Sequence, residues 1–465
     1  MTLIIVFIIL LSYLLIATER ISNINKAAVS IFAGTVGWVL YICYGTDYVM
    51  DLHPMEYIDY LRGAVPTSYA VKEYIAANVF LKYVGQAAEV VLFLLATMTI
   101  VEILYQNGCF NFVTALLRTK SSRKILWILS ALTFVLSANL DNQTTTIMML
   151  TIMHQAIPNR RQRMILGASI LLSATCGGAL TVIGDPMGLV LWNMGAVDAT
   201  NFSMSLLLPC LIAWAVPVAW LGRMLPERIE TERMTLSFRG DDTRLNAWQR
   251  LLMFLVGIGG LWFIPSFHSI THLSPFLGAL CVLSVLWVVN EVVNRRLMDS
   301  DNLERSSYPR TIQYGAIQMM LYVMGIMLAI GVLRETNVLT AFDQFLTTNV
   351  HNHWITGIAT GVISTVLDNF ATSMNMFSMH PVETLESLPP LETGYLDAFV
   401  TNGAYWKIIA YASAMGGNVL AIGSMSGLAL LKMERMHVGW YFKHVGWKAL
   451  VGALIGLAAL WIVLS

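Results

Sequence analysis

The sequence predicts an all-α membrane protein with about ten transmembrane helices and two re-entrant hairpins. Three observations support this fold class. Of the 465 residues, 57% are hydrophobic and only 12% are charged, about half the charge of an average soluble protein. Apolar runs of about 20 residues, the length that crosses a bilayer, recur along the chain. Two pairs of shorter apolar segments each enclose an Asp-Asn motif.

The long apolar runs place the full spans. We expect them at 3–18, 27–44, 86–105, 164–190, 203–222, 248–266, 273–293, 315–333, 404–430 and 446–464. The first run has no basic segment before it and no small-residue cleavage site after it, so we interpret it as a retained span rather than a signal peptide. The net charge of zero gives no reason to expect a nucleic-acid partner, and the five scattered cysteines have no metal-binding spacing. We therefore expect the lipid bilayer as a partner and no cofactor.

The two Asp-Asn motifs lie at the centre of the predicted hairpins. Ser137-Ala-Asn-Leu-Asp-Asn-Gln-Thr-Thr-Thr146 separates two apolar arms, and Ser364-Thr-Val-Leu-Asp-Asn-Phe-Ala-Thr372 separates two similar ones. An arm of 12–14 residues makes about 20 Å of helix, which is too short to cross the membrane. We therefore predict that hairpins 125–156 and 353–380 each enter and leave on one side.

The loop charges assign a side to each hairpin, because Lys and Arg concentrate in cytoplasmic loops. Basic residues flank the first hairpin at both ends, namely Arg118, Lys120, Arg123, Lys124, Arg160, Arg161 and Arg163. No Lys or Arg occurs between Arg334 and Lys407, around the second hairpin. The first hairpin should thus open inward and the second outward. By the same rule the loop holding Arg20 and Lys26 is cytoplasmic and both termini lie outside, in a multi-pass protein that we assign to a bacterial inner membrane.

A repeated pattern follows each hairpin. Ser173-Ala-Thr-Cys-Gly-Gly-Ala-Leu-Thr-Val-Ile-Gly-Asp185 and Ser413-Ala-Met-Gly-Gly-Asn-Val-Leu-Ala-Ile-Gly-Ser424 share their Gly-Gly and Ile-Gly frames. Because the hairpins face opposite sides, this pattern predicts an inverted repeat, as in many secondary transporters. We divide the chain into N-terminal scaffold spans at 1–85, a first repeat at 86–222, a linker with central scaffold spans at 223–310, and a second repeat at 311–465.

The hairpin tips carry the chemistry that the sequence predicts. A charged side chain at the bilayer centre costs at least about 2.5–3.5 kcal/mol, so acids placed there twice indicate a functional site. Asp141 and Asp368 would supply charge to a hard cation. Neutral oxygen ligands would come from Asn142, Thr144, Thr145, Ser364 and Asn369. The alternative is that each Asp-Asn pair only caps the following half-helix, a function compatible with ion binding.

Glycine pairs and further acids leave alternatives open. Gly177-Gly178 and Gly416-Gly417 could unwind their spans and expose backbone, or allow close helix packing. Asp185 could be a third acid of the site or a polar group at the outer interface. Glu89 and Glu102 lie about 140° apart around one helix, so only one of them could face the site as a proton relay. An interfacial position is the alternative for Glu102.

Four motifs together resemble NhaD-type sodium/proton antiporters of the ion-transporter superfamily. They are the hairpin segment 138–145, the segment 89–104, and the glycine segments 177–185 and 416–424. The resemblance implies inverted repeats, a homodimer held by scaffold spans, and elevator-like movement of the hairpin domain. It also implies an ion and proton path through Asp141, Asn142, Asp185, Asp368 and Asn369, with Ser364 and Ser413 as polar candidates. One departure is that Pro186-Met187-Gly188 follow Asp185, where the family usually has threonines.

These observations lead us to expect a secondary antiporter rather than an enzyme. It would export Na⁺ or Li⁺ in exchange for H⁺, with the cation held at Asp141, Asn142, Asp368 and Asn369 and competing with protons for the two acids. The first alternative is a sodium-coupled di- or tricarboxylate or oxyanion transporter on the same fold, although acids at the tips would repel an anion. The second is an intramembrane aspartyl protease, for which the duplicated tips and glycine pairs have no role.

Overall fold

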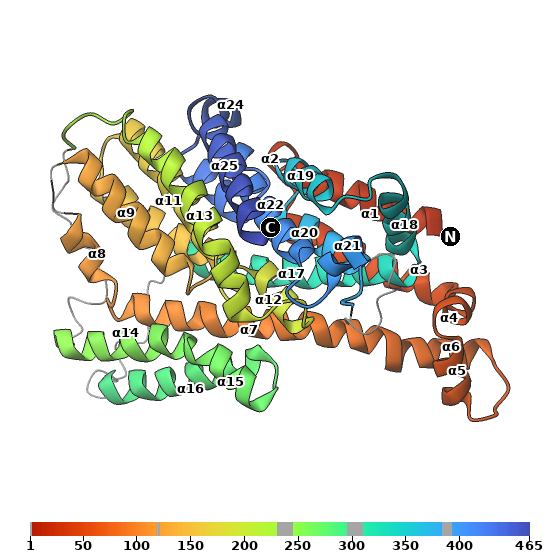
Figure 1. Cartoon of the computed structure of the whole chain (residues 1–465). Helices are drawn as coiled ribbons and strands as arrows, with labels where there is room; N and C mark the ends of the chain where they lie inside the picture. Colours follow the sequence, from red (N-terminus) through yellow and green to blue (C-terminus); the bar gives the residue numbers. More distant parts are fainter. Residues whose placement is uncertain (1, 118, 120, 230–244, 295–309, 384–392) are drawn as a thin grey trace.

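A computed structural model describes residues 2–465 except 118, 120, 230–244, 295–309 and 384–392 (Figure 1). All regular elements among these residues are helices, and β-structure there is limited to two isolated bridges. Arg118 and Lys120, which contributed to the predicted sidedness, lie outside the described residues.

Seven helical segments in the described part of the chain are long and apolar enough to cross a membrane. They are α3 (Lys26–Cys43), the helix Ser68–Gln106 that contains α7 (Leu81–Gln106), α13 (Ala199–Leu221), α16 (Pro275–Asn294), α17 (Arg310–Glu335), Ala404–Met433 and Val438–Leu464. An eighth forms if α14 (Ala247–Leu261) and α15 (Phe263–Thr271), bent by 41°, make one span. This confirms a polytopic helical membrane protein.

The two remaining expected spans are helical but interrupted or short. The run at 3–18 forms α1 (Thr2–Ala17), which has 16 residues. The run at 164–190 forms two helices, α11 (Arg160–Gly178) and α12 (Pro186–Asn193), separated by a break. The second run is divided because the chain places polar groups and a turn where an uninterrupted span would continue.

One part of the molecule is built on the long helix α7. Helices α14, α15 and α16 lie along one side of α7, as Figure 1 shows below it. Helix α17 packs against α7 and more extensively against α3, where the indole N–H of Trp38 donates to the carbonyl of Leu328 at 3.0 Å. Gly34 on α3 faces Gly325 and Leu328 so closely that a Cβ there would contact both. These helices form a continuous packed frame.

The hairpins lie on the other side of α7 (Figure 1). The first consists of α9 (Ser122–Ser137) and α10 (Asn142–Ala156), and the second of α19 (His353–Ser364) and α20 (Asn369–Met379). Each packs against a broken helix, α9 and α10 against α11, and α19 and α20 against α22 (Ala404–Leu420). Helix α25 (Trp447–Leu464) packs against α13 and α22 beside them.

The open ends of the hairpins lie at opposite ends of the broken helix that comprises α22 and α23 (Met425–Met433). At the first hairpin, His154 and Arg163 bind the carboxylate of Glu434, immediately after α23. At the second, the His380 ring lies 5.0 Å from the ring of Tyr405, in the first turn of α22. The hairpins therefore point toward each other from opposite ends, the arrangement that an inverted repeat requires. The repeat boundaries at 86–222 and 311–465 stay predictions.

Of the two alternatives for the glycine pairs, unwinding does not hold for the second pair. Helix α11 does end at Gly178, but Gly416 and Gly417 are helical, and α22 continues to Leu420. The alternative, close packing, describes these positions. A Cβ at Gly177 would collide with the carbonyl oxygen of Phe134, and one at Gly416 with that of Gly361. The glycines thus let each hairpin arm approach its broken helix.

Candidate ion-binding site

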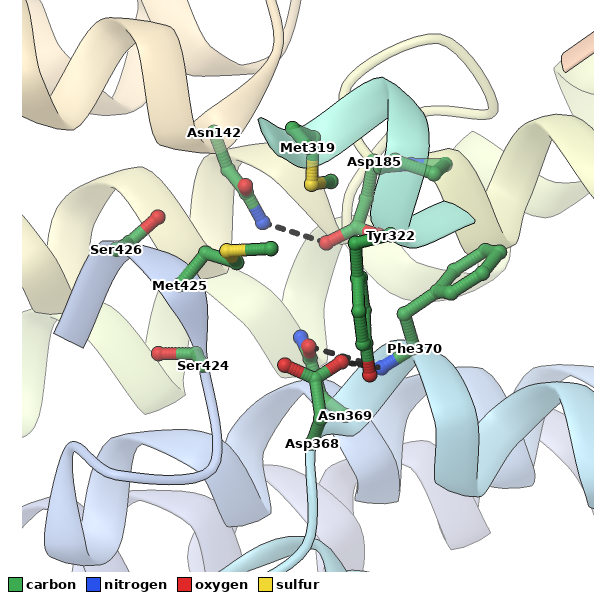
Figure 2. Close-up of a pocket in the computed structure, with 11 residues that line it drawn as sticks. Asn142, Asp185, Met319, Tyr322, Asp368, Asn369, Phe370, Ser424, Met425 and Ser426 are labelled. Atoms are coloured by element: carbon green, nitrogen blue, oxygen red, sulfur yellow. Dashed lines mark hydrogen bonds between the residues drawn. The ribbon is translucent and has the colours of Figure 1, made fainter. Parts of the chain in front are cut away.

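Four half-helices begin around one small cavity in the middle of the molecule (Figure 2). It is lined by Asn142, Asp185, Pro186, Met319, Tyr322, Asp368, Asn369, Phe370, Ser424, Met425 and Ser426. The half-helices are α10, α12, α20 and α23, and their N-caps are Asp141, Asp185, Asp368 and Ser424 respectively. Their N-termini carry partial positive charge, which stabilises the capping carboxylates.

Both hairpin aspartates cap the helix that follows them. Oδ2 of Asp141 accepts hydrogen bonds from the backbone N–H and the hydroxyl of Thr144, at 2.9 and 3.1 Å. Oδ1 of Asp368 accepts from the backbone N–H of Phe370 at 3.1 Å. The other oxygen of Asp141 is buried and has no hydrogen-bond partner among the described residues. Capping therefore leaves one oxygen of each carboxylate for another positive group.

Asp185 lies in the cavity rather than at an interface. Its Oδ2 accepts a hydrogen bond from the Asn142 side-chain amide at 2.5 Å, shown as a dashed line in Figure 2. Its Oδ1 caps α12 through the N–H of Met187 at 3.2 Å. The first hairpin tip and the first helix break are thereby joined at the site. This position agrees with the alternative of a third acid near the hairpin tips and not with a position at the outer interface.

Lys26 is a residue of the site that we did not predict from the sequence. We expected it in a cytoplasmic loop, but it is the first residue of α3, and its Nζ lies 2.5 Å from Oδ2 of Asp368. Both side chains are only 3% exposed, and Nζ lies 4.8 Å from the centre of the Tyr322 ring. The prediction failed because loop charge alone cannot show that α3 begins inside the protein. One signal was present, since Asn25, a good N-cap, places Lys26 inside the following helix.

Several predicted ligands support the hairpins instead of lining the cavity. The hydroxyl of Ser364 donates to the carbonyl of Ser413 at 2.6 Å, and that of Ser137 donates to Ala174 at 2.6 Å. The Ser413 hydroxyl donates to Ala410 in its own helix. The bonds of Ser364 and Ser137 fasten each hairpin to its broken helix.

The backbone makes the same connection at both tips. The N–H of Asn142 donates to the carbonyl of Gly184 at 3.2 Å, and that of Asn369 donates to Gly423 at 2.8 Å. Thr144 and Thr145 are buried in the first turn of α10 and do not line the cavity. Asp141 does not line it either, so Asn142, Asp368 and Asn369 are the predicted hairpin-tip ligands that do.

The two relay candidates lie away from the cavity. Glu89 accepts hydrogen bonds from Ser274 at 3.1 Å and from Asn193 at 3.3 Å. Asn193 ends α12, whose other end holds Asp185, so the 8-residue helix puts about 12 Å between them. Glu102 accepts from Gln106 one turn along α7, at 2.8 Å. Neither glutamate lines the cavity, whereas Asp185 and Asp368 do.

The chemistry of the cavity favours a small hard cation. Carboxylate, amide and hydroxyl groups line it, and alkali and alkaline-earth ions prefer such oxygens as ligands. With Asp185, Asp368 and Lys26 ionised, the formal charge at the cavity is two negative and one positive, a net −1, and Asp141, which precedes the lining residue Asn142, adds another negative charge nearby. Such a site attracts cations and repels anions, and burial makes both effects stronger than in water.

The fold is that of a polytopic membrane protein with an enclosed polar cavity. The chain belongs to the citrate transporter family (CitMHS), whose sequence pattern matches residues 13–379. It is 30% identical to sodium/proton antiporter 1 of Arabidopsis thaliana over an alignment of 383 residues. That alignment covers 81% of this chain and 62% of the plant protein. It is 25% identical over 387 residues to the Na⁺/H⁺ antiporter NhaD of Vibrio parahaemolyticus, covering 78% of this chain and 87% of that protein.

These relatives confirm the resemblance to NhaD-type antiporters that four motifs predicted. The chain spans 62% of the length of the first plant relative, and 84% of sodium/proton antiporter 2 of the same plant, at 29% identity. The family and these relatives are transporters. The protease alternative is therefore dropped, and the chain is not an enzyme.

Proposed function

We propose that this protein is a secondary antiporter that exports Na⁺, and Li⁺ by the same chemistry, in exchange for H⁺. One observation carries the proposal. Asp185 and Asp368, from the first and second halves of the chain, line one buried cavity together with Asn142 and Asn369. The names of the antiporter relatives point to Na⁺ and H⁺.

The mechanism that we propose is competition for carboxylate oxygens. Asp141, Asp185 and Asp368 bind the cation when they are ionised and bind protons when it leaves, so one ligand excludes the other. Asn142 and Asn369 add neutral oxygens. Neutralisation of the acids by either the cation or protons then permits the two hairpins and their broken helices to move as a unit. The bound ligand shifts the populations of the inward-facing and outward-facing states.

Carboxylate transport is the second candidate, because the family is described as citrate transporters. The charge of the cavity argues against it, since a citrate trianion would meet a net negative site. Among the described residues beside this cavity, Lys26 is the positively charged side chain that could bind such an anion. Its ammonium group is already paired with the carboxylate of Asp368. We therefore rank cation exchange first.

The assembly and membrane remain proposals as well. We propose a homodimer through the frame built on α7, a bacterial inner membrane, and termini on the outer side. Apolar side chains of α14 and α16, such as Leu255 and Val288, are more than half exposed in the single chain and would face lipid or a second copy.

Everted membrane vesicles test the proposed exchange. Addition of Na⁺ should dissipate a preformed pH gradient with the native chain, and Asp141→Asn, Asp185→Asn and Asp368→Asn should each abolish this response. Asp47→Asn, which changes an exposed acid, is the matched control and should behave as the native chain. Normal exchange by all three variants would remove the site assignment. Sodium-driven uptake of labelled citrate without proton exchange would establish the second candidate instead.

A further inference from the structure

We propose that Lys26 belongs to the ion site as a built-in competitor, whose ammonium group occupies Asp368 until a transported cation displaces it. This inference rests on the proposed cation exchange and deepens it. Lys26 lies far from both repeats in sequence, 342 residues from Asp368. No motif pointed to it.

The Lys26 ammonium group and a bound Na⁺ would both need Oδ2 of Asp368. Asp368 uses Oδ1 to cap α20 through the N–H of Phe370, and Oδ2 binds Lys26 at 2.5 Å. The carboxylate lines the cavity, so a cation that enters it meets Oδ2 already occupied. A Na⁺ ion at this oxygen and an ammonium at hydrogen-bond distance from it would repel each other strongly in a buried site. The two states therefore exclude each other.

The lysine is placed so that it can withdraw. Its backbone is fixed at the start of α3, where the Asn25 side chain accepts from the N–H of Ala27 at 2.9 Å. Its side chain is a flexible four-carbon stem that ends in a compact charge. Nζ already lies over the Tyr322 ring, 4.8 Å from its centre, and this cation–π contact does not depend on the bond to Asp368.

The ion pair also joins two parts of the molecule that the proposed mechanism moves past each other. Lys26 belongs to α3, which is packed on α17 within the frame, whereas Asp368 is the tip of a hairpin. While the pair is intact, it holds that tip against the frame. Displacement of Lys26 by the cation removes this connection, so cation binding and hairpin movement become coupled.

Two substitutions of Lys26 with opposite expected effects on Na⁺ affinity test the competition. Lys26→Met removes the competitor, whereas Lys26→Arg replaces it with a guanidinium that grips a carboxylate with two parallel hydrogen bonds. The half-saturating Na⁺ concentration should fall by roughly tenfold in the first variant and rise by a similar factor in the second, since a charged hydrogen bond is at stake. A purely structural role would not give opposite shifts.

Lys432→Met is the matched control. Lys432 on α23 pairs with Glu19 at 2.9 Å, so this ion pair also joins the N-terminal segment to the half-helices, but it does not contact Asp368. This variant should leave the half-saturating Na⁺ concentration unchanged.

Two readouts on the full chain separate the inference from the proposed function. One is the Na⁺ dependence of proton flux in proteoliposomes at a fixed alkaline pH, and the other is the Na⁺ dependence of thermal unfolding in detergent. If the native chain responds to Na⁺ in neither, the proposed function fails. If the native chain responds to Na⁺, two results refute the competition. Either both Lys26 variants have the native half-saturating Na⁺ concentration, or both change it in the same direction. If Lys26→Met does not fold, Lys26→Arg decides, because an unchanged or lowered concentration there also refutes it.

Discussion

Alanine at Gly177 or Gly416 should loosen the contact between a hairpin and its broken helix. At Gly177 the new methyl group would overlap the carbonyl oxygen of Phe134 in α9, and at Gly416 it would overlap that of Gly361 in α19. Both obstacles are backbone atoms, so no change of rotamer can relieve the clash. The hairpin arm must move away from the helix as a unit.

The size of the effect follows from two opposing contributions. Overpacking a buried contact costs typically about 1–3 kcal/mol, and a rigid backbone obstacle places these sites at the upper end. Alanine also raises helix propensity over glycine by about 1 kcal/mol, which offsets part of that cost. We therefore expect each variant to lose about 1–2 kcal/mol of stability.

Thermal unfolding of the purified protein, followed by tryptophan fluorescence, measures this loss. Gly85→Ala is the matched control, because a methyl group on this helical glycine of α7 would meet no described atom within 4 Å apart from its chain neighbours and the nearby backbone of its own helix. That variant should be as stable as the native chain or slightly more stable. Vesicle exchange should fall in Gly177→Ala as well, since separation of the hairpin disturbs the bond from Asn142 to Gly184. If Gly177→Ala and Gly416→Ala unfold at the same temperature as Gly85→Ala, the close approach of the hairpin arms to their broken helices is wrong.

Two further predictions concern individual side chains. Asn142→Ala leaves Asp185 without its amide donor, so we expect a loss of Na⁺ affinity of about tenfold in the exchange assay, and an unchanged half-saturating concentration would contradict the role of the amide. Glu89→Gln and Glu102→Gln should each retain more than about half of the native exchange rate, because hydrogen bonds to neutral side chains survive the change and neither residue lines the cavity. A loss of exchange in either variant would restore it as a proton relay.

The sequence was informative wherever the physical cause is local. The length of each apolar run sets whether a helix can cross the bilayer, and α9, α10, α19 and α20 begin or end within a few residues of the predicted arms. An Asp before a half-helix is an N-cap by its own chemistry, and Asp141 and Asp368 cap as one alternative proposed. The placement of Asp185 in the cavity was one of two possibilities, because a turn within a span does not reveal which way its acid points.

Packing between distant segments decided the rest. Gly416 looked like a helix breaker, yet only the approach of α19 shows that its missing side chain makes room for a backbone carbonyl. Glu89 and Glu102 lie on a membrane helix, but the sequence does not show which groups surround them. In the structure they accept hydrogen bonds from Ser274 and Gln106, which do not line the cavity. The sequence alone determined a helical membrane protein with acids at two hairpin tips, since apolar length and capping act within a few turns. Only the tertiary structure brought Lys26 to Asp368, because an ion pair across 342 residues depends on where α3 begins beside α17.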